Sequence, residues 1–97
     1  MRVRVTTQGA KDLVRAIAYL ESQSPQAADD FRQRFSQVID GLTRFDTSRA
    51  TLDPRYRIMN LQPFPYLIFL RRQQDQIEIV AVRHGARSPG SMPARPR

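Results

Sequence analysis

Arginine residues follow the two most apolar runs of the sequence. Arg71 and Arg72 come after the run 66–70, and Arg83 comes after the run 77–82. A guanidinium donates paired hydrogen bonds to phosphate or carboxylate oxygens. These side chains could therefore bind nucleic acid, pair with the acids of a bound protein, or form a solvated rim. The candidate target-binding residues are Arg55, Arg57, Tyr66, Arg71, Arg72, Arg83, His84 and Arg87.

His84 is the single histidine of the chain. Its imidazole could act as a general acid or base near neutral pH, or it could close the end of a strand by hydrogen bonding. The sequence fixes no second acid–base residue beside it. There is no cysteine, no paired-histidine motif and no phosphate-binding glycine loop. We therefore expect no metal and no cofactor, and a binding protein is favoured over an enzyme.

The chain is short and strongly basic. Its 97 residues include 16 Lys and Arg against 9 Asp and Glu, a formal net charge of +7, which favours nucleic acid or an acidic protein as the partner. We expect one domain at 1–88 and a disordered basic tail at 89–97. Because no signal peptide or membrane-spanning segment is recognisable, we expect a cytoplasmic protein without a membrane partner.

Two helices must position these residues. The first, at about 8–22, places Asp12 on its polar side. Its apolar residues are Leu13, Val14, Ile17 and Leu20. Ser24 and Pro25 begin the second helix, because serine caps free backbone N–H groups and proline suits the first helical position. The apolar stripe of that helix comprises Ala28, Phe31, Phe35, Val38, Ile39, Leu42 and, at its end, Phe45.

Four strands complete the predicted fold. Alternating or β-branched patterns place them at 2–6, 55–61, 66–70 and 77–82. The region between Phe45 and Pro54 is predicted to be a loop, and the polar residues 71–76 a longer hairpin loop. The order β-α-α-β-β-β predicts an α+β domain, in which a helical hairpin packs on a largely antiparallel four-stranded sheet.

Two segments of the sequence carry a family resemblance. They are PYLIF at 65–69 and IEIVAVRHGAR at 77–87. At this spacing, behind a helical hairpin, they resemble the ParE branch of the RelE/ParE toxins of bacterial type II toxin–antitoxin modules, over about residues 2 to 89. The resemblance implies the same α+β architecture.

RelE-like members of this superfamily cleave messenger RNA on the ribosome. The resemblance would give Arg57 the role of a second-strand basic residue and Arg83 or Arg87 that of the late arginine. Tyr66 stands where a third-strand arginine is expected, and no tyrosine follows His84. The groups needed to stabilise phosphorane charge and activate the 2′-hydroxyl are thus incomplete. A ribonuclease would depend on Arg57, His84 and Arg87.

ParE-like members, which the sequence resembles more closely, are not nucleases. The resemblance implies a toxin that poisons DNA gyrase and is neutralised by a cognate antitoxin wrapping a segment around it. Arg83, His84 and Arg87 are the candidates for touching the target. The antitoxin is expected to bring acidic charge and an amphipathic helix or strand. A third alternative is an inactive basic interaction module of the same fold.

Overall fold

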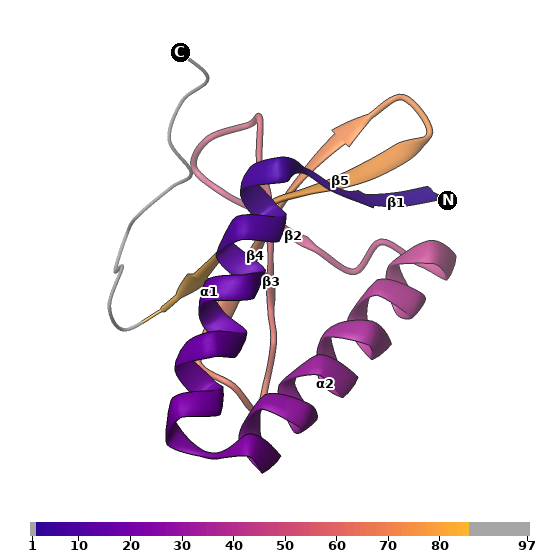
Figure 1. Cartoon of the computed structure of the whole chain (residues 1–97). Helices are drawn as coiled ribbons and strands as arrows, with labels where there is room; N and C mark the ends of the chain where they lie inside the picture. Colours follow the sequence, from indigo (N-terminus) through magenta and orange to yellow (C-terminus); the bar gives the residue numbers. More distant parts are fainter. Residues whose placement is uncertain (1, 86–97) are drawn as a thin grey trace.

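The computed structural model describes residues 2–85, in which two helices lie on one side of a sheet (Figure 1). Its elements are β1 (Arg2–Val5), α1 (Thr7–Gln23), α2 (Pro25–Arg44), β2 (Arg49–Ala50), β3 (Arg57–Asn60), β4 (Tyr66–Gln73) and β5 (Gln76–His84). Arg87, the predicted domain end at residue 88 and the predicted tail at 89–97 lie outside the described residues. No helix within 2–85 has the length and apolarity to cross a membrane.

The strands form a mixed sheet in the order β1-β5-β4-β3-β2. β1 runs parallel to β5, and the other neighbours are antiparallel. This arrangement confirms the predicted α+β fold with a helical hairpin on a largely antiparallel sheet. The described sheet has one strand more than the four predicted, because Arg49 and Ala50, within the predicted loop, pair with Ile58 and Arg57.

Two predicted boundaries are corrected by the structure. β3 begins at Arg57 instead of residue 55, because Asp53 accepts a hydrogen bond from the backbone N–H of Arg55 (3.0 Å) and holds that segment in a turn. The predicted hairpin loop is much shorter. β4 and β5 continue as a ladder to Gln73 and Gln76, and only Gln74, at φ 54°, and Asp75 form the turn.

The starts of both helices follow from capping side chains. The Thr6 hydroxyl accepts a hydrogen bond from Gly9 N–H (3.1 Å) and begins α1. The Ser24 hydroxyl accepts one from Ala27 N–H (3.3 Å) and begins α2, with Pro25 at the first helical position. The predicted start of the second helix is therefore confirmed. Ser24 N–H also donates to Leu20 O (2.8 Å), which closes α1 in the same turn.

The main core lies between the helices and the sheet. Its buried residues are Ala16, Phe31, Phe35, Val38, Leu42, Leu61, Tyr66, Ile68, Leu70, Ile77, Ile79 and Val82. The Phe31 ring meets the rings of Phe64 and Tyr66 edge-on, each at 5.3 Å. The predicted stripe of the second helix is thus confirmed as core, except that Phe45 is 74% exposed. In the first helix, Val14 was predicted to be apolar core but is 67% exposed.

The sheet has a second apolar cluster apart from this core. Tyr56, Phe69, Val80 and Ala81 are buried there, with Ile58 and Leu67 packed against them. Met59 and Leu61 belong to the core beneath the helices instead. The alternation predicted along 55–61 is therefore observed, because successive strand residues point to opposite faces.

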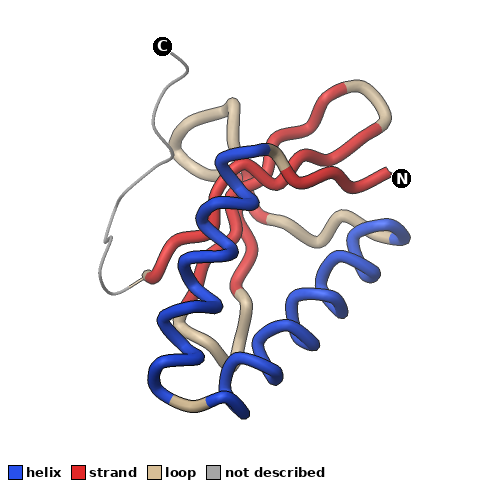
Figure 2. The backbone as a smooth tube through the Cα atoms, in the orientation of Figure 1, coloured by secondary structure: helices blue, strands red, loops and turns tan. Residues whose placement is uncertain are grey.

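α1 packs directly against the backbone of β5. β1 stops at Val5, opposite Ile79, and β5 continues alone along that edge (Figure 2). The carbonyl of Ile79 accepts hydrogen bonds from Thr6 N–H (3.0 Å) and Thr6 Oγ1 (3.1 Å). Beyond it, Asp12 Oδ2 accepts a hydrogen bond from Val82 N–H (3.1 Å). The capping residue Thr6 and the side chain of Asp12 therefore continue the pairing that β1 leaves unfinished.

Because α1 lies so close to β5, we expect opposite effects from adding a side chain at two helical glycines. A Cβ at Gly9 would collide with the carbonyl oxygen of Ile79, whereas a Cβ at Gly41 would meet no atom within 4 Å. We expect Gly9→Ala to lower the free energy of unfolding by about 1–3 kcal/mol. Gly41→Ala should raise it by about 0.5–1 kcal/mol through better helix propensity. Urea titrations of both variants test the pair, and an equal or more stable Gly9→Ala protein would contradict the described packing.

Candidate functional site

The candidate residues divide into two groups at opposite ends of the β4–β5 hairpin. Arg71 and Arg72 pair with residues next to the turn, whereas Tyr66 and Leu67 pair with His84 and Arg83 at the far end. Antiparallel pairing requires this separation, because each group of arginines lies towards the C-terminal end of its own strand. The candidates therefore form two sites instead of one continuous surface.

Each group lines a hollow in the surface. The first, here called the β2–β3 hollow, has a volume of about 570 Å³ and includes Arg55, Tyr56, Arg57, Arg71 and Arg72. The second, here called the α1 hollow, has a volume of about 350 Å³. Its lining includes Asp12, Arg15, Tyr19, Tyr66, Arg83 and His84.

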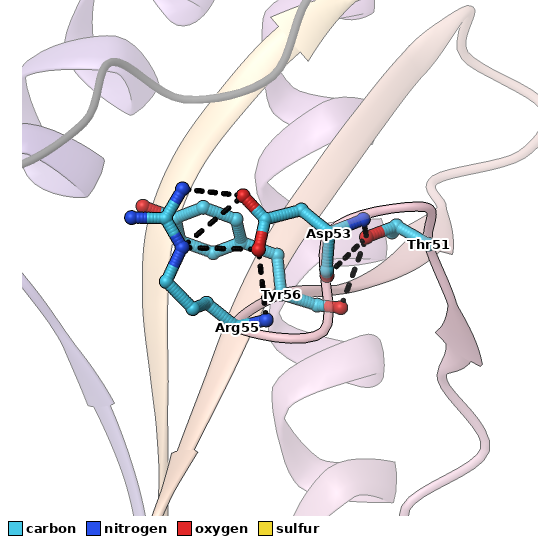
Figure 3. Close-up of polar contacts among 4 residues, drawn as sticks. All are labelled: Thr51, Asp53, Arg55 and Tyr56. Atoms are coloured by element: carbon cyan, nitrogen blue, oxygen red, sulfur yellow. Dashed lines mark hydrogen bonds and ion pairs between the residues drawn. The ribbon is translucent and has the colours of Figure 1, made fainter.

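Arg55 is held by its own neighbours at the β2–β3 hollow (Figure 3). Its Nε donates to both carboxylate oxygens of Asp53 (3.0 and 3.1 Å), and Nη2 donates to Oδ2 (2.5 Å). These bonds raise the pKa of the Arg55 guanidinium, which also lies 5.3 Å from the centre of the Tyr56 ring. Thr51 Oγ1 donates to the carbonyls of Asp53 (2.7 Å) and Tyr56 (3.1 Å) and fixes the turn.

Asp46 and Ser48 hold two more arginines of this hollow. Arg57 donates to Ser48 Oγ (2.7 Å) and to Ser48 O (2.5 Å), and Arg72 Nε donates to Asp46 Oδ2 (2.6 Å). Burial of the Asp46 carboxyl acts to raise its pKa, but hydrogen bonds from Ser48 and Arg72 outweigh burial. The net result is a lowered pKa, so the folded protein favours the charged carboxylate.

The fourth arginine of the hollow is also paired within the chain. Arg71 donates to Oε1 of the buried Glu78 through Nε (3.0 Å) and Nη2 (2.6 Å), and Arg4 lies 3.6 Å from the other carboxylate oxygen. All four arginines at the β2–β3 hollow thus meet an acid or carbonyl of their own chain. Their hydrogen-bonding groups are thus used within the chain before any partner arrives, although three carboxylates serve the four arginines.

The side chains of the α1 hollow are less completely hydrogen-bonded. The rings of Tyr66 and His84 meet edge-on at 5.1 Å. Arg83 Nε lies 3.8 Å from Asp12 Oδ2, and Arg15 Nη1 lies 3.8 Å from Asp12 Oδ1. These separations allow ionic attraction but exceed hydrogen-bond length. Two positive side chains therefore share one buried carboxylate.

Sequence reasoning missed the contribution of α1 to this hollow. Asp12 was predicted on the polar side of the first helix, but it is 3% exposed. It is buried because it accepts hydrogen bonds from Val82 N–H and from Gln8 Nε2 (2.9 Å). A buried carboxylate with such donors satisfies the rule that buried charges are paired. No local sequence signal distinguishes it from an exposed aspartate of the same helix.

The residues of a ribonuclease centre are not brought together among the described residues. Arg57 is paired with Leu70, and His84 with Tyr66, so they are separated by four positions along β4. At about 3.3 Å per strand residue this is roughly 13 Å. Within 2–85 there is also no group of three or more His, Asp or Glu side chains placed to hold a metal ion.

The lowered pKa of Asp46 gives a pH-dependent prediction. A carboxyl whose pKa is lower in the folded state stabilises the fold above the unfolded value of about 3.9, and this contribution disappears as the pH falls through the folded pKa. We expect Asp46→Asn to lower the unfolding midpoint at pH 7, with the difference shrinking below about pH 4. Asp75→Asn, in the exposed hairpin turn, controls for the loss of one charge. A difference that grows towards low pH would contradict the described contacts.

The chain is similar to proteins of one family. The family described as "ParE toxin of type II toxin-antitoxin system, parDE" matches residues 3–89. Two proteins described as Toxin ParE2, from Mycobacterium tuberculosis strains CDC 1551 / Oshkosh and ATCC 25618 / H37Rv, are 31% identical over 94 residues, or 96% of this chain and 90% of theirs.

A solved structure shows that the fold is shared as well. It is described as "Chromosomal ParDE TA system from P. aeruginosa" and has a TM-score of 0.77 at 19% identity, over 87% of this chain and 95% of that chain. The match to the family and the two relatives extends over nearly the whole sequence. This chain therefore belongs to the ParE toxin family of type II toxin–antitoxin systems.

Proposed function

We propose that this ParE-type toxin inhibits DNA gyrase in the cytoplasm and is neutralised by a cognate acidic antitoxin. The carrying observation is the position of Arg83 and His84, which line the α1 hollow at the free end of the β4–β5 hairpin. There, Arg83 and Arg15 lie 3.8 Å from the carboxylate of Asp12, beyond hydrogen-bond length. This end of the sheet is therefore better suited to an external partner than the β2–β3 hollow, whose arginines donate hydrogen bonds within the chain.

The same geometry favours gyrase over messenger RNA as the target. RNA cleavage needs acid–base and phosphate-stabilising groups around one scissile phosphate. Arg57 and His84 line different hollows, and the side chain of Arg57 is already bound to Ser48. Inhibition of gyrase requires only a binding surface. Arg83 and His84 are the described residues that we assign to that surface, and Arg87 is its expected extension.

An enzymatic assay separates the two targets. Purified toxin should inhibit supercoiling by gyrase. The Arg83→Ala variant should need at least about ten times the wild-type concentration for half inhibition, because a hydrogen bond to a charged group contributes about 1.5–3 kcal/mol. Arg44→Ala is the matched control, since Arg44 forms an exposed pair with Asp40 on α2. Untouched gyrase, together with messages cut at A-site codons in primer extension, would reject the proposal.

The antitoxin is expected to be acidic because basic charge remains after the internal pairs are formed. Within residues 2–85, most acidic side chains already pair with arginine. The described basic residues that form no ion pair are Arg2, Lys11, Arg34 and Arg49. An acidic partner would meet this excess and gain from long-range attraction.

Thermal unfolding with the co-encoded antitoxin tests this part of the proposal. A partner that binds only the folded toxin at one hundred times its dissociation constant adds about 2.7 kcal/mol. For a domain of this size the unfolding midpoint should rise by roughly 10–20 °C. The rise should shrink at 1 M salt, where charges are screened within about 3 Å. An unchanged midpoint at saturating antitoxin would contradict neutralisation by binding.

A further inference from the structure

Two buried polar side-chain atoms within residues 2–85 have no hydrogen-bond partner. They are Tyr66 Oη and Arg83 Nε. Both residues line the α1 hollow. Tyr66 is only 4% exposed. A buried donor without an acceptor costs about 1–3 kcal/mol, so two such donors beside one hollow indicate an acceptor that binds there.

Residues 2–85 do not supply this acceptor. The nearest acid is Asp12, whose Oδ2 accepts from Val82 N–H and whose Oδ1 accepts from Gln8. It lies 3.8 Å from Arg83 Nε, which exceeds hydrogen-bond length. Asp12 therefore attracts Arg83 without satisfying its N–H group. Both atoms are buried, so an incoming oxygen atom would reach Arg83 Nε and the Tyr66 hydroxyl only after the side chains around them move aside.

The charges at the hollow specify the kind of ligand. Arg15 and Arg83 carry two positive charges against the single negative charge of Asp12, so one monoanion would neutralise the site. The two unpaired donors suit the two oxygens of a carboxylate, which accepts bonds from an arginine and a hydroxyl together. Because both donors are sheltered from water, such bonds are stronger than at the surface.

We propose that the α1 hollow binds one carboxylate of an acidic side chain from a protein partner, which under the proposed function is the antitoxin. A nucleic acid would need a row of cations to follow its backbone. Within residues 2–85, the arginines that line this hollow are Arg15 and Arg83, and the arginines of the β2–β3 hollow are bound to their own chain. An antitoxin carboxylate here would cover Arg83 and so block the residue assigned to gyrase.

The variant Tyr66→Phe isolates the proposed contact by removing one oxygen atom. The free protein should be as stable as the wild type or more stable, because the hydroxyl is unpaired. The dissociation constant for the co-encoded antitoxin should rise about tenfold, equivalent to about 1.4 kcal/mol. Tyr56→Phe makes the same change at the buried tyrosine of the β2–β3 hollow and should leave this affinity unchanged. Isothermal titration calorimetry measures both variants.

A second measurement uses acetate in place of the antitoxin. The Nε–H signal of Arg83 in ¹⁵N-labelled toxin should shift saturably with sodium acetate, and less in Tyr66→Phe. Because this nitrogen is buried, its proton exchanges slowly and remains observable. The acetate titration tests the hollow independently of the antitoxin. If the antitoxin fails to bind wild-type toxin, only the proposed neutralisation is rejected.

Three results would overturn the inference. The first is equal affinity of wild type and Tyr66→Phe for the antitoxin. The second is a Tyr66→Phe protein that is clearly less stable when free, which would show that the hydroxyl already has a partner. The third is an Arg83 signal that ignores acetate but shifts with a single-stranded oligonucleotide, which would assign the hollow to nucleic acid.

Discussion

The structure depends on how the unpaired edge of β5 is satisfied beyond the end of β1. β5 extends to His84, but β1 ends opposite Ile79. An exposed strand edge leaves backbone N–H and C=O groups without partners. Thr6 and Asp12 supply those partners from the start of α1, and the absence of a side chain at Gly9 lets the helix come close enough. The contact of Asp12 with Val82 also places Asp12 beside Arg83, and all three residues line the α1 hollow.

The two hollows show that net charge alone does not locate a binding surface. At the β2–β3 hollow, Asp46, Asp53 and Glu78 already hold the arginines, so their guanidinium groups mainly fix the loop and the hairpin. At the α1 hollow, the buried carboxylate of Asp12 accepts a hydrogen bond from the backbone N–H of Val82. The donors Arg83 Nε and Tyr66 Oη beside it have no hydrogen-bond partner. Function is therefore better sought where hydrogen bonding is incomplete than where arginines are most numerous.

Patterns within single elements predicted much of the fold. The stripe of α2 and the alternation of β3 were readable, because each depends on the period of one element. β2 was not, since two residues show no period. The candidate site was less predictable, because its pairings join distant positions. Arg72 meets Asp46 from 26 residues away, and Val82 meets Asp12 from 70 residues away.

The parallel pairing of β1 with β5 also constrains how this toxin folds as it leaves the ribosome. The hydroxyl of Thr6 donates to the carbonyl of Ile79, which is 73 residues further along the chain. β1 and the start of α1 therefore cannot dock until nearly the whole domain has emerged. Such non-local pairing slows folding, and chains are synthesised from the N-terminus at roughly 5–20 residues per second. A nascent chain that stops short of His84 therefore lacks the α1 hollow. The hollow is among the last features of the described domain to form, because its lining joins the start of α1 to the end of β5.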